Sequence, residues 1–203
     1  MTMPTRERLN LIGPRISSPE FREQRGIGNE IACYIFDYPP EDELEVRSFL
    51  PVLLKHLRTD RPDASILQLD LFDVVLEYLE HRKLLAQALR MQGAKPDADL
   101  LKALRGALSV ERLRDHIQSV HKLDAHDMVL MSGVGRVWPM IRMHSLLNAL
   151  HVAMGTTPLL LFYPGCFDGT SLRLFGDVEQ ESTTPNPKPY YRAFTLVPGG
   201  PTA

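Results

Sequence analysis

Four arginines lie in the last third of the sequence, in or beside motifs rich in glycine, proline and aromatic residues: Arg136, Arg142, Arg173 and Arg192. A planar guanidinium group binds a carboxylate or a phosphate through two parallel hydrogen bonds. The four arginines are therefore the strongest candidates in the sequence for binding an anionic group. The alternative interpretation is structural, because the same side chains can tie the C-terminal motifs to backbone carbonyls.

Two carboxylates and a tyrosine end segments that predict buried strands. Asp37 and Asp70 each follow an apolar stretch, and Tyr163 precedes Pro164 and Gly165. In an open parallel sheet, ligands bind beyond the carboxyl ends of the strands. The aspartates suit a hydrated Mg²⁺, but capping the next helix or turn is the interpretation we favour. We take Tyr163 and Gly165, with Tyr191 further along the chain, as binding candidates, note Asp37 and Asp70 as strand-end carboxylates, and assign no metal ligand.

A glycine pair, Gly133 and Gly135, stands between a predicted strand and a predicted helix. Backbone N–H groups at such a place can hold a phosphate. The dinucleotide pattern GxGxxG would need a third glycine at position 138, where this sequence has Trp138, and no GxxxxGK[ST] loop occurs. The pair is therefore either half of a phosphate-binding motif or a turn that needs unusual backbone torsion angles.

Signatures that combine a nucleophile with its base, or two metal-binding histidines, do not occur in the sequence. His116, His121 and His126 recur every five residues, which fits no ordinary ligand spacing, and we expect them to be solvated or helix-capping. Cys33 and Cys166 lie in separate apolar stretches and are expected to be buried thiols. We therefore predict no catalytic residue, no metal and no cofactor, and a protein that is not an enzyme.

A repeated strand-then-helix pattern must position these residues. The chain has 203 residues, 44% of them hydrophobic, so a sizeable core is available. Strands are predicted at residues 31–37, 65–70, 127–133, 157–163, 172–175 and 191–197, and helices at 44–57, 74–93, 97–121 (interrupted near 106–109) and 139–154. Because the strands are nearly continuously apolar, we predict an open, mostly parallel α/β sheet with helices on both faces, like a nucleotide-binding fold without a phosphate loop.

We expect residues 1–203 to form one domain. Residues 1–28 are predicted to be an N-terminal helical cap whose short helices break around Gly13 and Pro14, and residues 181–189 an exposed Pro-rich loop. The start of the chain lacks the apolar core of a secretory signal, and no apolar run is long enough to span a bilayer. We therefore expect a cytoplasmic protein without membrane contact.

Charge is unevenly distributed along the chain, although the formal net charge is only −2. Residues 40–80 carry 4 basic and 10 acidic side chains, whereas residues 82–122 carry 9 basic and 4 acidic ones. The net charges of the two segments are therefore −6 and +5. Such separation is typical of solvated helix faces, but it also suits orientation of a protein partner or, on the basic segment, contact with phosphates.

Three parts of the sequence together resemble one family: residues 29–43, residues 132–148, and residues 161–176 with 190–194. The elements Tyr163-Pro-Gly165, Ser171-Leu-Arg-Leu-Phe-Gly176 and Tyr190-Tyr-Arg-Ala-Phe194 are specific as a set. The sequence is similar to the BrxB family, small components of the BREX bacteriophage-exclusion systems of bacteria. The resemblance runs from about residue 9 to residue 197 and departs from the family pattern at the Pro-rich segment 181–189.

Membership would imply a role in blocking phage replication beside an adenine methyltransferase, a large ATPase and PglZ, a member of the alkaline-phosphatase superfamily. PglZ is the partner we expect first. The family has no established catalytic activity, so matching positions are family-typical rather than catalytic: Gly133, Gly135, Pro139, Arg142, Pro164, Gly165, Arg173, Gly176, Tyr191 and Arg192.

The residue patterns and the family resemblance together leave three functions open. The first is a non-catalytic adaptor that binds PglZ and helps to assemble the defence complex. The second is a ligand- or nucleotide-sensing, or weakly catalytic, subunit whose strand-end crevice uses Arg136, Arg142 and Arg192 for an anion and Asp37 or Asp70 for a metal. The third is a subunit that contacts DNA or tRNA through residues 82–122.

Overall fold

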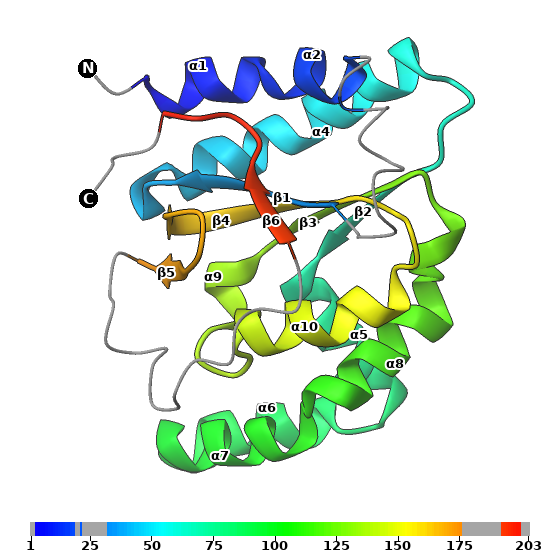
Figure 1. Cartoon of the computed structure of the whole chain (residues 1–203). Helices are drawn as coiled ribbons and strands as arrows, with labels where there is room; N and C mark the ends of the chain where they lie inside the picture. Colours follow the sequence, from blue (N-terminus) through cyan, green and yellow to red (C-terminus); the bar gives the residue numbers. More distant parts are fainter. Residues whose placement is uncertain (1–2, 19–20, 22–31, 176–191, 200–203) are drawn as a thin grey trace.

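Strands and helices alternate along the chain, as the sequence predicts (Figure 1). The structure, a computed structural model, describes residues 3–18, 21, 32–175 and 192–199. The strands are β1 (Ala32–Tyr38), β2 (Ile66–Asp70), β3 (Met128–Ser132), β4 (Leu159–Phe167), β5 (Leu172–Leu174) and β6 (Arg192–Thr195). The helices are α1 (Thr5–Asn10), α2 (Ile12–Ser17), α4 (Glu43–Asp60), α5 (Leu71–His81), α6 (Leu85–Ala94), α7 (Asp97–Ala107), α8 (Val110–His121), α9 (Val134–Val137) and α10 (Met143–Ala153), with 3-10 turns η2 (Pro40–Asp42) and η3 (Leu123–Ala125).

The strands form an open, mostly parallel sheet in the order β2-β3-β4-β1-β6. Each neighbouring pair in this order is parallel, and β5 pairs antiparallel with β4. The predicted fold class is therefore confirmed. Parallel pairing places the carboxyl ends of the strands at one edge of the sheet, where the sequence predicted the candidate residues to lie.

Both faces of the sheet are apolar, which explains why the strands read as continuous hydrophobic runs. On β1, Tyr34 and Phe36 belong to the core beneath α1, α2 and α4, whereas Ile35 belongs to the core on the other face, with α5, α8 and α10. On β4, Leu160 and Leu161 alternate in the same way. Successive side chains of a strand point to opposite faces, so a sheet covered on both faces needs apolar residues at every position.

The segment around Pro139 differs from the prediction. A helix was expected from Pro139 to Met154, but α9 ends at Val137 and α10 begins only at Met143. The backbone of Trp138 is extended, with ψ at 141°, and the Trp138–Pro139 peptide is cis. A residue before proline is pushed out of the helical region, and this ends the first helix.

Two other helix boundaries also differ from the prediction. The N-terminal helices break at Leu11, and Gly13 and Pro14 lie within α2, where Pro14 occupies the first turn and its missing N–H costs no helical bond. The helix expected over residues 74–93 is divided into α5 and α6 by a turn in which Lys83 has a φ of 58°. The predicted loop 181–189 lies outside the described residues.

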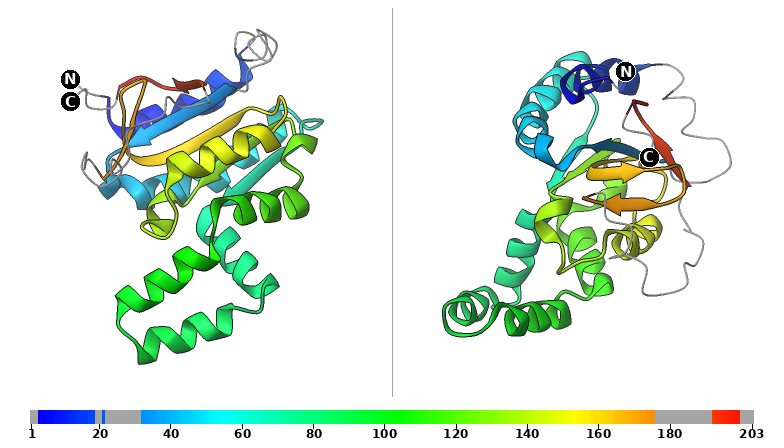
Figure 2. Two further views of the ribbon diagram at one scale, coloured as in Figure 1. Left: turned by 60° about the horizontal axis from the view of Figure 1, so that its bottom comes forward. Right: turned by 90° about the vertical axis from the view of Figure 1, so that its left-hand side faces the viewer.

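Helices α6 and α7 form a hairpin that stands away from both helical layers (Figure 2). Neither helix contains a buried residue, whereas α5 and α8, which flank them in sequence, bury several. Within the described part of the chain, no helix is both long and apolar enough to cross a bilayer.

Candidate functional site

The carboxyl edge of the sheet brings the predicted strand-end residues into register. Asp70 pairs with Ser132 of β3, and Asp37 pairs with Tyr163 of β4. Side-chain contacts then divide the candidates, because Asp37 and Asp70 bind different arginines. Among the described residues, no group of three or more His, Cys, Asp or Glu side chains is arranged to hold a metal ion.

Asp70 is the centre of a small polar network at the ends of β2 and β3. Its Oδ1 accepts from the backbone N–H of Phe72 at 2.9 Å and of Asp73 at 3.4 Å, so it caps the start of α5. Its Oδ2 pairs with Arg136 and accepts from the Ser132 hydroxyl at 3.4 Å. The Arg136 guanidinium lies 5.3 Å from the centroid of the Phe72 ring, within reach of a cation–π interaction. Asp70 therefore has the capping role that the sequence favoured.

The two glycines of the turn after β3 each accommodate a close neighbour. Gly133 has a φ of +80°, and a Cβ atom there would lie 2.5 Å from Oδ1 of Asp70. A Cβ atom on Gly135 would lie 3.2 Å from the Phe175 ring and from Cγ of Pro164. At Gly133 both the torsion angle and the contact with Asp70 require glycine. These features match the structural interpretation of the turn.

Asp37 is bound by an arginine from the other end of the chain. Arg8 donates from Nη1 to the backbone oxygen of Asp37 at 2.7 Å, and from Nη2 to Oδ1 of Asp37 at 2.8 Å and to the oxygen of Val197 at 2.9 Å. The second carboxylate oxygen of Asp37 accepts from the N–H of Phe167 at 3.0 Å. The Arg8 guanidinium also lies 4.8 Å from the centroid of the Phe36 ring. One buried ion pair therefore joins α1, β1, β4 and the segment after β6.

Sequence reasoning did not identify Arg8 as a functional or structural residue. It lies on the buried side of α1 beside Leu9, and only 1% of it is exposed. The apolar positions Leu9, Ile12 and Ile16 are the signal that could have found it, because an arginine within such a buried face must have a partner. The partner is distant in sequence, so spacing alone could not reveal it.

The motif that ends β4 is held together by internal contacts. Tyr163 is fully buried, and a Cβ atom on Gly165 would overlap the backbone oxygen of Arg173 on β5. Arg173 donates from Nη2 to Oδ2 of Asp168 at 3.1 Å. The hydroxyl of Ser171 donates to the same Oδ2 at 2.6 Å, and this hydrogen bond lowers the pKa of Asp168 below its usual range. The carboxylate thus stays ionised and organises the turn between β4 and β5.

The four predicted arginines do not share one partner. Arg136 pairs with Asp70 and Arg173 with Asp168, while Arg142 is exposed just before α10. Arg192 begins β6, but its side chain lies outside the described residues, as does the whole of Tyr191. The structure therefore places two of the four arginines in separate ion pairs rather than around one anion site.

A tyrosine adds a proton donor to the strand-end edge. The hydroxyl of Tyr38, at the end of β1, donates to Oε2 of Glu43 at 2.6 Å. Burial, followed by the charge of Glu43, raises the pKa of Tyr38 above its ordinary value. The phenol therefore stays protonated and fixes the first turn of α4 rather than serving as a base.

The structure corrects the prediction for one of the histidines. His116 is neither solvated nor capping: it is 7% exposed and lies against Tyr78, with ring centroids 5.3 Å apart. His121 ends α8 and lies 3.1 Å from Oε2 of Glu77, and His126 contacts the backbone oxygen of His121 at 3.0 Å, which is a capping contact. His116 lies on the same buried face of α8 as Leu113 and Ile117. The five-residue spacing of the three histidines gave no indication of this.

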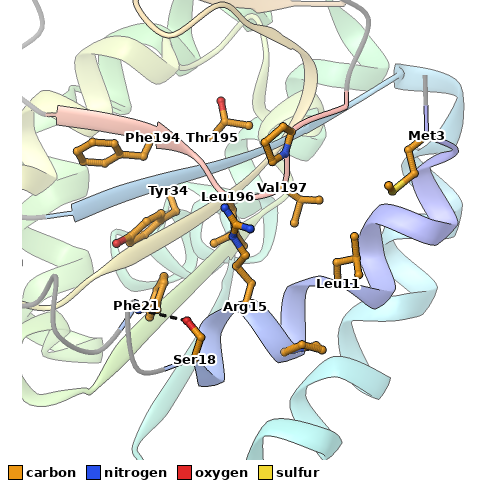
Figure 3. A pocket seen from close by; sticks show the side chains of 12 residues that line it. Met3, Leu11, Arg15, Ser18, Phe21, Tyr34, Phe194, Thr195, Leu196 and Val197 are labelled. Atoms are coloured by element: carbon orange, nitrogen blue, oxygen red, sulfur yellow. Dashed lines mark hydrogen bonds between the residues drawn. The ribbon is translucent and has the colours of Figure 1, made fainter. Parts of the chain in front are cut away.

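A groove of about 750 Å³ runs between the N-terminal helices and β6 (Figure 3). Tyr34 and Phe194 line one side of it, and Leu11, Arg15 and Ser18 line the other. Among the described residues, those that line it include none of the sequence-predicted candidates. The groove and the polar strand-end network are therefore different features of the molecule.

Comparison with known proteins identifies the family. A profile of the family described as "BREX protein BrxB" matches residues 67–196, which is more than half of the chain. The chain belongs to the BrxB family. Its membership makes it a component of a BREX phage-defence system, as the resemblance in the sequence implied.

Two curated relatives cover nearly the whole of this BrxB family member. The chain is 38% identical over 193 residues to a BREX protein BrxB of Bacillus cereus (strain H3081.97), covering 94% of this chain and 96% of the relative. It is 39% identical over 197 residues to a BREX protein BrxB of Escherichia coli O9:H4 (strain HS), covering 97% and 94%. No solved structure matches the chain.

Several BrxB-typical positions have structural explanations here. Gly133 allows the approach of Asp70, and Gly165 allows the approach of the β5 backbone. Arg173 holds the turn that contains Asp168. Each is a place where chain segments approach closely, so these family-typical residues coincide with packing requirements of the fold.

Proposed function

We propose that this BrxB family member is a non-catalytic adaptor subunit of its BREX system, acting in the bacterial cytoplasm and binding a PglZ-type partner. The observation that carries the proposal is the use of the strand-end polar groups within the fold. Asp37 is bound by Arg8, Asp70 by Arg136, and Tyr38 by Glu43. An edge whose charges are already compensated is suited to stabilising the domain, and binding to a partner then falls to the outer surface.

The alternative of a ligand-sensing crevice has less support. Asp70 neutralises Arg136, so this arginine offers little net charge to an incoming phosphate. Asp37 has both of its carboxylate oxygens bonded to protein groups. A nucleotide or Mg²⁺ that raises the melting temperature at millimolar concentration would restore this alternative, since a ligand stabilises the state that binds it.

The adaptor function is tested by mixing the purified protein with the PglZ protein of the same BREX system. We expect a stable complex in size-exclusion chromatography with light scattering. The phosphatase-like partner run alone is the reference. Separate elution at concentrations well above micromolar would contradict the proposal. The same experiment is repeated with two other BREX components, the ATPase and the methyltransferase, in place of PglZ.

A further inference from the structure

The α6–α7 hairpin has little reason to be stable without something against it. Its helices are 10 and 11 residues long, below the roughly 12–15 residues at which isolated helices become stable in water. Neither contributes a buried residue to the core. The hairpin contacts the rest of the domain through a few partly buried side chains, Leu84, Leu85 and Leu104. Two hydrogen bonds add to these contacts: Arg105 donates to the backbone oxygen of Pro139 at 3.0 Å, and the Tyr78 hydroxyl donates to that of Ala107 at 3.1 Å. Most of the hairpin surface therefore faces outward (Figure 2).

An apolar groove of about 110 Å³ runs along this hairpin. Its lining residues repeat at helical spacing on both helices: Leu84, Gln87, Ala88 and Met91 on the side of α6, and Leu100, Ala103, Leu104 and Ala107 on α7. Leu79 of α5 completes the lining. A cavity of roughly 150 Å³ in a protein core holds a benzene molecule, so this groove has room for about one aliphatic side chain. Leu89 of α6 adds a further apolar surface, 59% exposed.

The charge of the hairpin is positive and uncompensated on α6. Residues 82–107 carry 6 basic and 2 acidic side chains, and the two acidic ones, Asp97 and Asp99, lie in the first turn of α7, where they offset the helix dipole. Arg90 and Lys102 are exposed, and each directly precedes a groove residue in the sequence, Met91 and Ala103. Neither forms an ion pair within the described part of the chain.

We infer that the α6–α7 hairpin is a docking surface for an acidic amphipathic helix of a partner protein. An apolar side chain of that helix fills the groove, and its acidic residues pair with Arg90 and Lys102. The spacing of the groove residues suits a third helix packing against two. A nucleic acid is the less suitable occupant, because phosphate contacts make no use of an apolar groove or of exposed Leu89. The inference rests on the adaptor function and names its surface.

The test compares two hairpin variants with a matched control in binding to PglZ. Arg90→Glu with Lys102→Glu reverses two charges, and Ala103→Trp fills the groove from an exposed position. The control, Lys55→Glu with Arg58→Glu, makes the same change of charge on exposed residues of α4. We expect each hairpin variant to weaken binding at least about tenfold and the control to change it less than about twofold. Amide hydrogen exchange over residues 85–107 should slow in the wild-type complex.

The outcomes separate the inference from the adaptor function. If wild-type protein binds PglZ and both hairpin variants bind equally well, the adaptor function stands and the hairpin inference is wrong. If wild-type protein does not bind PglZ, the adaptor proposal for this partner fails, and phage restriction in cells that carry the complete BREX system decides the inference. Restriction lost only in the hairpin variants supports docking of another component, whereas full restriction overturns it.

Two further measurements exclude other occupants. If the charge-reversal variant no longer binds a random-sequence DNA duplex but still binds the partner protein, the hairpin is a nucleic-acid-binding surface and not a protein-docking surface. A wild-type dimer that the same variant dissociates would show that the surface is occupied by a second copy of this chain. Circular dichroism and the melting temperature confirm that each variant is folded.

Discussion

Arg8 and Asp37 form an ion pair of 2.8 Å although 29 residues separate them, with 1% and 7% of their side chains exposed. Removing one partner of a buried pair leaves the other charged and unpaired, which typically costs about 3–5 kcal/mol. We expect Arg8→Met to lower the free energy of unfolding by about this amount in a urea titration. Arg6→Ala, on an exposed position of the same helix, is the control and should change it by less than about 0.5 kcal/mol.

The double variant Arg8→Met, Asp37→Asn tests the cause of that loss. Since it removes both charges, it should be more stable than Arg8→Met alone. If the double variant loses as much free energy of unfolding as Arg8→Met and Asp37→Asn lose together, the charges do not interact in the folded protein.

Gly133 and Asp70 should be coupled in stability. Gly133→Ala places a Cβ atom 2.5 Å from Oδ1 of Asp70 at a φ of +80°, so we expect a loss of about 1–3 kcal/mol. Asp70→Ala removes the cap of α5 and should cost about 1–2 kcal/mol. In the double variant the close contact is absent, and the measured loss should be smaller than the sum. Strict additivity would disprove the steric coupling.

His116 should make stability decrease in acid. Burial lowers the pKa of His116 below 6.5, partly offset by Glu77 and reinforced by His81 and His121. Because the unfolded chain takes up this proton at a higher pH than the folded protein, the folded state is favoured above about pH 6.5 and loses stability as the pH falls through and below that value. His144, whose pKa burial also lowers, acts in the same direction.

The contribution of His116 is isolated by comparing His116→Gln with wild type. The free energy of unfolding, measured at about pH 7.5 and about pH 5.5, should fall less between these conditions in the variant. His56→Gln, an exposed histidine of α4, should behave like wild type. An unchanged pH dependence in His116→Gln would show that other groups cause it.

The two cysteines should differ in reactivity. Burial raises the pKa of the Cys33 thiol to about 12, and burial with the nearby charge of Asp37 raises the pKa of Cys166 above its ordinary value. Because the thiolate is the nucleophile, native protein at mildly alkaline pH should alkylate slowly. Partly exposed Cys166 should react before buried Cys33, as followed by mass spectrometry. Faster labelling of Cys33 would contradict its burial.

The sequence by itself determined the alternation of strands and helices and the parallel sheet. Successive side chains of β1 and β4 are buried on opposite faces of the sheet, so both strands appear in the sequence as uninterrupted apolar runs. Glycines in the turns mark where strands end. The family could also be predicted from the sequence, because short contiguous motifs such as Tyr163-Pro-Gly165 are specific as a set. The role of Asp70 was predictable too, since capping of the following helix is a local interaction.

Tertiary structure alone decided which charged groups meet. Arg8 reaches Asp37, and Arg136 reaches Asp70, across 29 and 66 residues. The exposed position of α6 and α7 likewise could not be read from their amphipathic pattern, which resembles that of a helix covered by a core. Local spacing records the periodicity of an element, but the partner of a side chain depends on how distant elements pack, and no local pattern contains that information.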